Sequence, residues 1–440
     1  AKADILTAWE RKYNERDKIS NDEYIRDYIG HYMNKDAYLS AETGYMLVQG
    51  LLPTITTADF IPRMEAWFQE KNRSLVITGP EGEGHVHLTR EEAKAIFEKV
   101  AAADMEPYEE EAMAESLLSA ELVPSTIIST QKLEAFDATE WTLENGAKII
   151  YRHADFEKDE VRIRAFSPGG ASLYEDQDVP SADMLTGLTS FYGLGEFDAT
   201  SLQKMLAGKQ VEQNMSLGDL NEGLIGQSST RDLDTMMQLL YLAFNEPRFD
   251  EEAHMAIMSR YRGLVENLGN NPQKIMSDSL SLILSDHHPR TRIFDMEYLE
   301  DIEYATLEKI YRERFTDADD FFFVIVGNME EEEVKLLAQK YIGAIGDLDR
   351  TETWIDREVY EPEGVVEKTS PLALETPKAN VNIIINQEME YTPYNQMVMR
   401  VIEGILDLRY VESIREEEGG TYGVRIRASV SKFPVEKASM

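Results

Sequence analysis

Helical and strand-like periodicities alternate along the chain. Over the first 115 or so residues, charged positions with apolar residues every three or four places predict helices, with starts at Asn21 and Thr56. A short apolar run at 74–78 predicts a strand. Thr89 followed by Glu92 has the spacing of a capping box, which predicts another helix. The N-terminal part is therefore expected to be mainly helical.

The central part begins with strong strand signals. Residues 141–151 carry Asn145-Gly146 between two apolar runs, which predicts a tight β-hairpin. Residues 161–166 alternate apolar side chains with arginines, as a strand with one solvated face would, and a Ser-Pro-Gly-Gly turn follows. Helical spacing then predicts helices that begin at Ser181 and Thr200 and that cover 233–244 and 253–268.

An ordered set of elements occurs twice. A helix over 307–315, an apolar strand over 321–326, a turn at Gly327 and a helix over 330–342 repeat the order predicted around Gly79. The two turn glycines are 327 − 79 = 248 positions apart, too far for a solenoid repeat. Any single element could match by chance, but the ordered set suggests duplicated domains.

Two charged linkers divide the chain. The first, 104–121, is acidic and resembles a helix, and the second, 346–368, is charged and contains proline. The last part is predicted to form a strand at 381–386, a long helix from Pro393 to about residue 417, and a strand at 422–430. No partner element follows that strand, so the final domain is expected to be truncated.

Composition excludes several classes of function. The 440 residues include 82 acidic and 44 basic side chains, giving a net charge of −38, which disfavours nucleic acid as a partner. The absence of cysteine excludes disulfides, thiolate metal sites and cysteine nucleophiles. No apolar run approaches the ~18 residues of a membrane span.

The motifs of common catalytic sites are missing. None of the seven histidines lies in an HExxH or HxxEH spacing, which would place two imidazoles and a carboxylate at one ion. His85 and His87 would share one face of a strand, but a polar loop is the preferred interpretation. There is no GxSxG elbow and no phosphate-binding glycine loop. We therefore expect no metal site and no complete catalytic centre in this chain.

One segment has candidate chemistry. A helix runs into Gly419-Gly420, and a strand is predicted to start at Tyr422, which places Arg415 and Tyr422 close across the turn. Arginine can bind a carbonyl or carboxylate, and a tyrosine hydroxyl can donate to a developing oxyanion. The alternative is an arginine favoured by the C-terminus of the helix and a tyrosine packed at a sheet edge.

These features together resemble a known family. The hairpin at 141–146, the Gly169-Gly170 turn that leads to Leu173, and Arg415 seven residues before Tyr422 resemble the pitrilysin/insulinase zinc peptidases (inverzincins), which include mitochondrial processing peptidase. The resemblance implies an α+β fold of repeated modules, each a mainly antiparallel sheet covered by helices. It also implies the end of a second module at 1–120, a third at 121–350, and a truncated fourth at 351–440.

The same resemblance implies a role without metal. In the family, the zinc-binding HxxEH helix follows the equivalent of the strand at 161–166, whereas the corresponding helix here, 181–192, contains neither His nor Glu. The chain is thus expected to be the C-terminal half of a zinc metalloendopeptidase. Zinc would be bound by an HxxEH half, in the same polypeptide or in a separate subunit. Arg415 and Tyr422 match the pair that binds peptide backbone and helps to stabilise the tetrahedral intermediate.

An alternative belongs to another class, a catalytically inactive scaffold or core subunit of a larger complex. Localisation, oligomeric state and peptide specificity stay open at this point. An acidic chamber would favour basic peptides by electrostatic steering, but the negative charge could equally coat the outside of the molecule.

Overall fold

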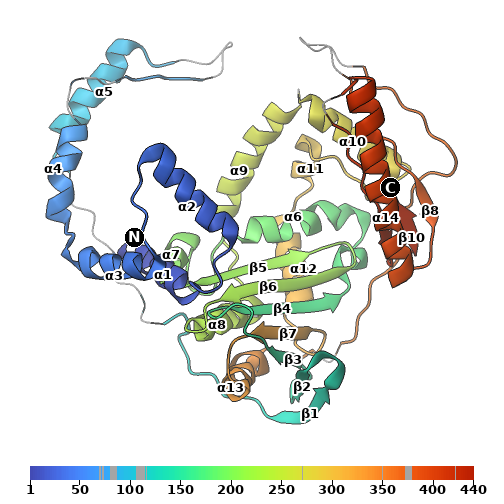
Figure 1. The fold of residues 1–440 in the computed structure, drawn as a ribbon, viewed down its shortest axis with the longest axis horizontal. Coiled ribbons are helices and arrows are strands. Elements are labelled where there is room, and N and C mark those ends of the chain that lie inside the picture. The colour runs from blue at the N-terminus through green and yellow to red at the C-terminus, as the bar shows by residue number, and fades with distance from the viewer. Residues whose placement is uncertain are drawn as a thin grey trace. The chain divides into compact units, whose positions relative to one another are not determined.

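The computed structural model describes residues 1–68, 71, 74–79, 87–105, 114, 116–269, 271–348, 350–371, 379–421 and 423–440. The chain divides into two compact units (Figure 1). The smaller unit comprises 1–119, 157–159 and 203–210, and the larger unit comprises 120–156, 160–202 and 211–440. Within the described ranges, none of the helices is long and apolar enough to cross a membrane.

The smaller unit is helical, as its periodicity predicts. The predicted capping box is present, because the backbone N–H of Thr89 donates to Glu92 (2.8 Å), and the predicted helix start at Thr56 has a second one, in which the N–H of Thr56 donates to Asp59 (2.7 Å). The predicted strand at 74–78 is wrong, because no described residue forms a β-ladder with it. The helices are α1 (Lys2–Asn14), α2 (Asn21–Asn34), α3 (Ala41–Leu51), α4 (Thr57–Trp67) and α5 (Arg90–Ala102).

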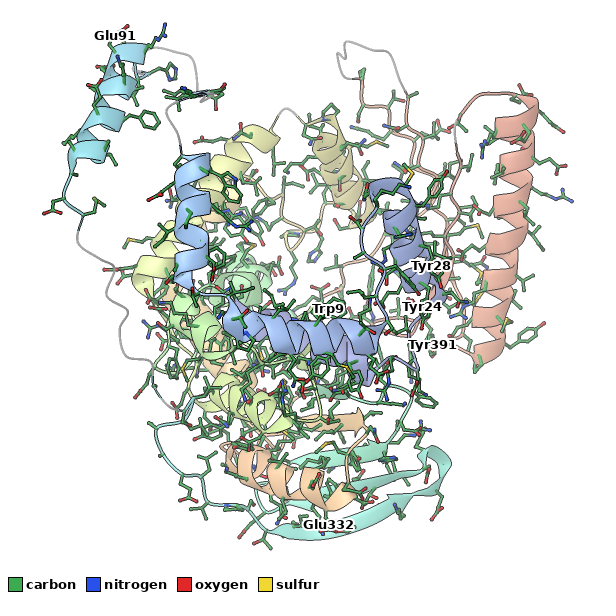
Figure 2. All side chains as sticks on the ribbon, turned by 60° about the vertical axis from the view of Figure 1, so that its left-hand side comes forward. Trp9, Tyr24, Tyr28, Glu91, Glu332 and Tyr391 are labelled. Atoms are coloured by element: carbon green, nitrogen blue, oxygen red, sulfur yellow. The ribbon has the colours of Figure 1, made fainter. Side chains whose placement is uncertain are left out.

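Aromatic side chains make close packing contacts in this unit. Trp9 of α1 lies against Gly44 of α3, where an added Cβ would be only 1.9 Å from the indole ring. Figure 2 shows Trp9 on α1 and the pair Tyr24 and Tyr28 on α2, whose stacked rings have centroids 6.5 Å apart. The close α1–α3 approach therefore depends on a glycine at position 44.

The larger unit is built on a seven-stranded sheet in the order β1-β2-β3-β7-β4-β6-β5. Every neighbouring pair is antiparallel except β3 and β7, which are parallel. This confirms the predicted α+β class with a mainly antiparallel sheet. The strands are β1 (Ile127–Leu133), β2 (Ala138–Leu143), β3 (Lys148–His153), β4 (Val161–Pro168), β5 (Val211–Leu217), β6 (Asn221–Ser228) and β7 (Phe322–Gly327).

The helices predicted for the larger unit are present within a few residues. The strands β1, β5 and β6 and the helices α10 and α11 were not predicted. The helices are α6 (Val179–Thr189), α8 (Leu233–Asn245), α9 (Glu251–Leu268), α10 (Pro272–Leu284), α11 (Met296–Glu300), α12 (Tyr304–Phe315), α13 (Glu331–Tyr341) and α14 (Pro393–Tyr410). Helix α7 (Ala199–Met205) contributes residues to both units.

One face of the sheet forms the core. Helices α6, α8, α12 and α13 contact it, and Trp141 stacks on Tyr151 across the hairpin with centroids 6.0 Å apart. Each large apolar side chain buried here contributes about 1.5–3 kcal/mol. The fully buried inward-facing residues include Trp141, Ile149, Tyr151, Ile163, Leu224, Phe323 and Ile325.

The opposite face of the same sheet is solvent-exposed. Alternate residues of the central strands point to it, among them Phe166, Ile225, Phe322 and Val324, which are 39%, 54%, 43% and 36% exposed. The alternation of apolar and arginine residues over 161–166 predicted such a solvated face, and the burial pattern of β4 confirms it. We call this surface the open sheet face.

The C-terminal part carries a small sheet in the order β8-β10-β9, beside α14 (Figure 1). The strands predicted at 381–386 and 422–430 are much shorter than expected. Instead of forming a ladder, the backbone N–H groups of Ile426 and Ala428 donate to Asp407 and Glu403 of α14, each at 3.2 Å. The strands are β8 (Asn386–Glu388), β9 (Ser429–Ser431) and β10 (Lys437–Ser439).

The internal repeat is present only in part. Its second copy is formed as predicted by α12, β7 and α13. Its first copy has the helices α4 and α5 but no strand between them in the described residues. Half of the first linker, 104–121, lies outside the described residues.

Candidate functional site

Arg415 lies at the end of the long C-terminal helix. Helix α14 ends at Tyr410 and continues as a π-helical turn, Val411–Glu417, so the helix reaches the predicted end point with a wider last turn. The Arg415 side chain is 55% exposed, and its Nε lies 3.6 Å from a carboxylate oxygen of Glu416. Such an exposed pair adds at most about 1 kcal/mol, so it would be easily exchanged for another anion or carbonyl.

The Gly419-Gly420 turn closes the helix. Gly419 has φ +60°, the left-handed conformation that favours glycine at a helix C-terminus. The N–H of Gly420 donates to the carbonyl of Ile414 at 3.0 Å, which fixes the turn directly beside Arg415. Tyr422 lies outside the described residues, so its proximity to Arg415 stays a prediction.

The helix that would carry zinc in the catalytic modules carries none of the required ligands here. In α6, Asp183 is the one residue with a metal-ligating side chain, and the Tyr298 hydroxyl donates to it at 3.2 Å. Leu185 and Leu188 are fully buried, so this helix is used for packing. A zinc site needs three or four convergent His, Cys or carboxylate ligands, and the residues of α6 do not fit one.

Three carboxylates do meet elsewhere. Side-chain oxygens of Asp317, Asp319 and Asp347 lie within 4.8 Å of one another, the one such group in the part of the chain that the structure describes. Asp317 already accepts hydrogen bonds from the N–H of Leu348 (3.0 Å) and from Arg350 (3.1 Å). Burial, together with the adjacent Asp317 carboxylate, raises the pKa of Asp319 to about 7. The group lacks the nitrogen ligands typical of zinc. Asp317 and Asp319 come just before β7, and Asp347 lies at the start of the second linker.

Three arginines fix the Gly-Gly turn that follows β4. Arg290 donates to the carbonyls of Ala171 (2.8 Å) and Tyr174 (2.7 Å). Arg357, from the second linker, donates to the carbonyl of Ser172 at 2.6 Å. Arg314 of α12 donates to the Tyr174 hydroxyl at 3.0 Å. This turn therefore anchors the second linker to the larger unit.

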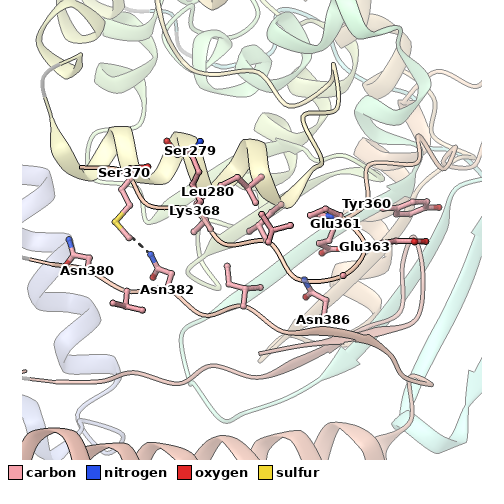
Figure 3. Close-up of a pocket in the computed structure, with 18 of the residues that line it drawn as sticks. Ser279, Leu280, Tyr360, Glu361, Glu363, Lys368, Ser370, Asn380, Asn382 and Asn386 are labelled. Atoms are coloured by element: carbon pink, nitrogen blue, oxygen red, sulfur yellow. Dashed lines mark hydrogen bonds between the residues drawn. The ribbon is translucent and has the colours of Figure 1, made fainter. Parts of the chain in front are cut away.

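The structure has a cavity of about 1610 Å³. It is lined by α10, by the two segments 360–371 and 379–390, and by residues 435–437. Figure 3 shows Ser279 and Leu280 of α10 together with Lys368 and Asn382 among the residues that line it. Arg415 does not line this cavity. The candidate substrate-binding residue Arg415 and this cavity are thus separate features.

Comparison with known proteins finds a family model that matches part of the chain. Residues 301–432 match the family model described as the peptidase M16 inactive domain, a range that contains α12, β7, α13, α14 and Arg415. Residues 301–432 therefore carry a match to the peptidase M16 inactive domain, in line with the resemblance to the pitrilysin/insulinase zinc peptidases.

Two relatives of this chain have the names of zinc proteases. The chain is 20% identical over 404 residues to the probable zinc protease PqqL of Haemophilus influenzae, covering 90% of this chain and 42% of the relative. It is 24% identical over 349 residues to a zinc protease PQQL-like protein of Arabidopsis thaliana, covering 78% and 33%. The chain therefore spans less than half the length of these relatives.

Solved structures show the same fold. The crystal structure of the periplasmic protease PqqL from Escherichia coli has a TM-score of 0.63 at 18% identity, covering 100% of this chain and 48% of that chain. The ferredoxin protease FusC, in complex with Arabidopsis ferredoxin, has a TM-score of 0.62 at 14% identity, covering 99% and 48%.

Proposed function

We propose that this chain is the metal-free, C-terminal half of a zinc metalloendopeptidase. The HxxEH half, in the same polypeptide or in another subunit, would bind zinc and supply the activated water and the glutamate base. This half would close over the substrate, exclude water from the chamber and hold the peptide in place.

The match to the inactive domain carries this proposal, and two further observations support it. Helix α6 follows β4, where the family resemblance expects the zinc-binding helix of a catalytic module, but it packs with Leu185 and Leu188 and has no histidine. The relatives are named zinc proteases, and each is more than twice as long as the part that this chain covers.

Arg415 and Tyr422 would act on the substrate from this half. The guanidinium of Arg415 is exposed on the last helical turn, where it can donate to a peptide carbonyl. The Tyr422 hydroxyl would donate to the oxyanion that forms when water attacks the scissile carbonyl. A donor of this kind typically contributes about 10²–10³-fold in turnover.

The test uses the complete enzyme that contains this chain. Tyr422→Phe and Arg415→Ala should lower kcat/KM for a peptide substrate by about 10²-fold or more, in line with the loss of one oxyanion donor. Arg409→Ala is the matched control, because Arg409 is also exposed and lies one to two turns earlier on the same helix. Unchanged turnover in all three variants would instead favour the alternative, an inactive scaffold or core subunit.

A further inference from the structure

The open sheet face combines positive charge with apolar side chains. The outward positions of the four central strands, β3, β7, β4 and β6, include no acidic residue. They include four basic ones, Lys148, Arg152, Arg162 and Arg164, all exposed. The flanking strands β2 and β5 add two acids to the same face, Glu140 and Glu212, so the four bases still leave it net positive in a chain of net charge −38.

The strand register arranges these side chains in rows. Arg164 of β4 is flanked by Val324 of β7 on one side and by Ile225 of β6 on the other. In the next row Phe166 pairs with Phe322, which pairs with Lys148 of β3. Neighbouring strands lie about 4.8 Å apart, and outward residues of one strand recur about every 6.8 Å. Cations and apolar side chains are thus interleaved over four strands.

The positive charge is only partly neutralised. Arg162 forms an ion pair with Glu160, at the start of β4, and the Lys148 ammonium lies 5.2 Å from the centroid of the Phe322 ring. Among the described residues, no carboxylate forms an ion pair with Arg152 or Arg164. Unlike other described cations that lack an ion pair, such as Arg260 on α9, Arg164 lies between apolar side chains of the neighbouring strands, so this row can bind a negatively charged and partly apolar molecule.

We propose that the open sheet face binds extended acidic peptide segments that contain apolar residues. Substrate carboxylates would bind Arg152 and Arg164, because a guanidinium matches a carboxylate in a two-bond geometry. Apolar substrate side chains would pack on Phe166, Phe322 and Ile225. This inference rests on the proposed function and names its substrate class. The expected preference for acidic peptides is opposite to the preference for basic peptides that an acidic chamber would have.

The test measures binding to the 440-residue chain by fluorescence anisotropy. The probe is a labelled twelve-residue peptide that alternates Glu with Leu and Phe, and two matched peptides carry Lys or Gln in place of Glu. The Glu peptide should bind at least tenfold more tightly than the Lys peptide, and its affinity should fall as salt is raised. Equal binding of the Glu and Lys peptides would overturn the proposal.

Charge-reversal variants locate the binding surface. Arg164→Glu and Arg152→Glu should each weaken binding of the Glu peptide at least tenfold. Arg260→Glu, which makes the same charge change on the exposed side of α9, should change it by less than twofold. Equal losses in all three would mean a general charge effect and would contradict the proposal. Circular dichroism checks folding, and Arg164→Gln provides a milder variant.

A competing oligonucleotide separates peptide binding from general polyanion binding. A single-stranded DNA of the same net charge as the Glu peptide should compete poorly, because it lacks the alternating apolar side chains. Stronger competition by DNA than by unlabelled Glu peptide would overturn the choice of a peptide ligand. The binding assay needs no turnover, so its outcome is independent of the kinetic test. The Glu peptide can fail to bind while the Arg415 and Tyr422 variants still lower kcat/KM, or it can bind while those variants have no effect.

Discussion

Glu222 of β6 and Arg314 of α12 form an ion pair inside the larger unit, with 3.4 Å between Oε1 and Nη1. Their side chains are 0% and 4% exposed. The other oxygen of Glu222 accepts the N–H of Gly170 at 2.6 Å, and Arg314 also pairs with Glu352 of the second linker at 2.6 Å. This pair therefore connects the sheet, a helix, the Gly-Gly turn and the linker.

Loss of Arg314 should be strongly destabilising. Arg314→Met leaves Glu222 buried without its cation, and breaking a buried pair in this way costs about 3–5 kcal/mol. Arg312→Met is the matched control on the same helix, because Arg312 pairs with Glu308 at 2.8 Å on the surface. The control substitution should lower the free energy of unfolding by less than about 1 kcal/mol. Urea unfolding measures both, and equal losses would show that the buried pair has no special role.

The acidic group around Asp319 should make stability depend on pH. The raised pKa of Asp319, about 7, means that the folded state keeps a proton which the unfolded state loses near pH 4. The free energy of unfolding should therefore fall as pH rises from about 4 to 7, and stay reduced above that range.

Asp319→Asn should remove this fall. Relative to the wild type, the variant should be more stable at pH 8 than at pH 5 by about 1–2 kcal/mol, a value discounted for the partial exposure of the group. Thermal unfolding at the two pH values measures the difference. Asp155→Asn changes an exposed aspartate of the same unit and should show no such dependence. A pH-independent effect of Asp319→Asn would contradict the raised pKa.

Two glycines should respond oppositely to the same substitution. Gly170 has φ +64°, and an added Cβ would lie 2.4 Å from the carbonyl oxygen of Gly218. Gly170→Ala should therefore lower the free energy of unfolding by about 2–3 kcal/mol. At Gly187, inside α6, an added Cβ meets nothing within 4 Å, so Gly187→Ala should raise it by about 0.5–1 kcal/mol. Urea unfolding of both variants decides, and a neutral Gly170→Ala would refute the strain argument.

Zinc should not stabilise this chain. Helix α6 supplies no histidine, and the one group of three carboxylates in the described residues lacks nitrogen ligands. After dialysis with zinc, metal analysis should find well below one equivalent per chain. Addition of a chelator should leave Tm unchanged. One tightly bound zinc that raises Tm would contradict the proposal of a metal-free half.

Much of the local structure could be predicted from the sequence, because its signals act over a few residues. Asn145-Gly146 sets the hairpin turn, with Gly146 at φ +81°, and Thr89 with Glu92 caps α5. The alternation over 161–166 indicated a strand with one solvated face. The lack of His and Glu in the helix after that strand is likewise visible in the sequence.

Only the tertiary structure decided what depends on partners far apart in the chain. Residues 74–78 have the composition of a strand but no described ladder partner, and Ile426 and Ala428 donate to α14 instead of to a neighbouring strand. Arg290 and Arg357 meet at one turn because two distant segments converge there.

The open sheet face has the same origin. The alternation within β4 announced one solvated face, but its neighbours Val324 and Ile225 come from β7 and β6, which lie 60 or more residues further along the chain. Sheet register, not spacing along the chain, places the cations and apolar side chains side by side. The sequence by itself indicated the family resemblance, the α+β class and the missing zinc ligands, whereas the long-range strand pairing decided that an acidic protein presents a basic surface.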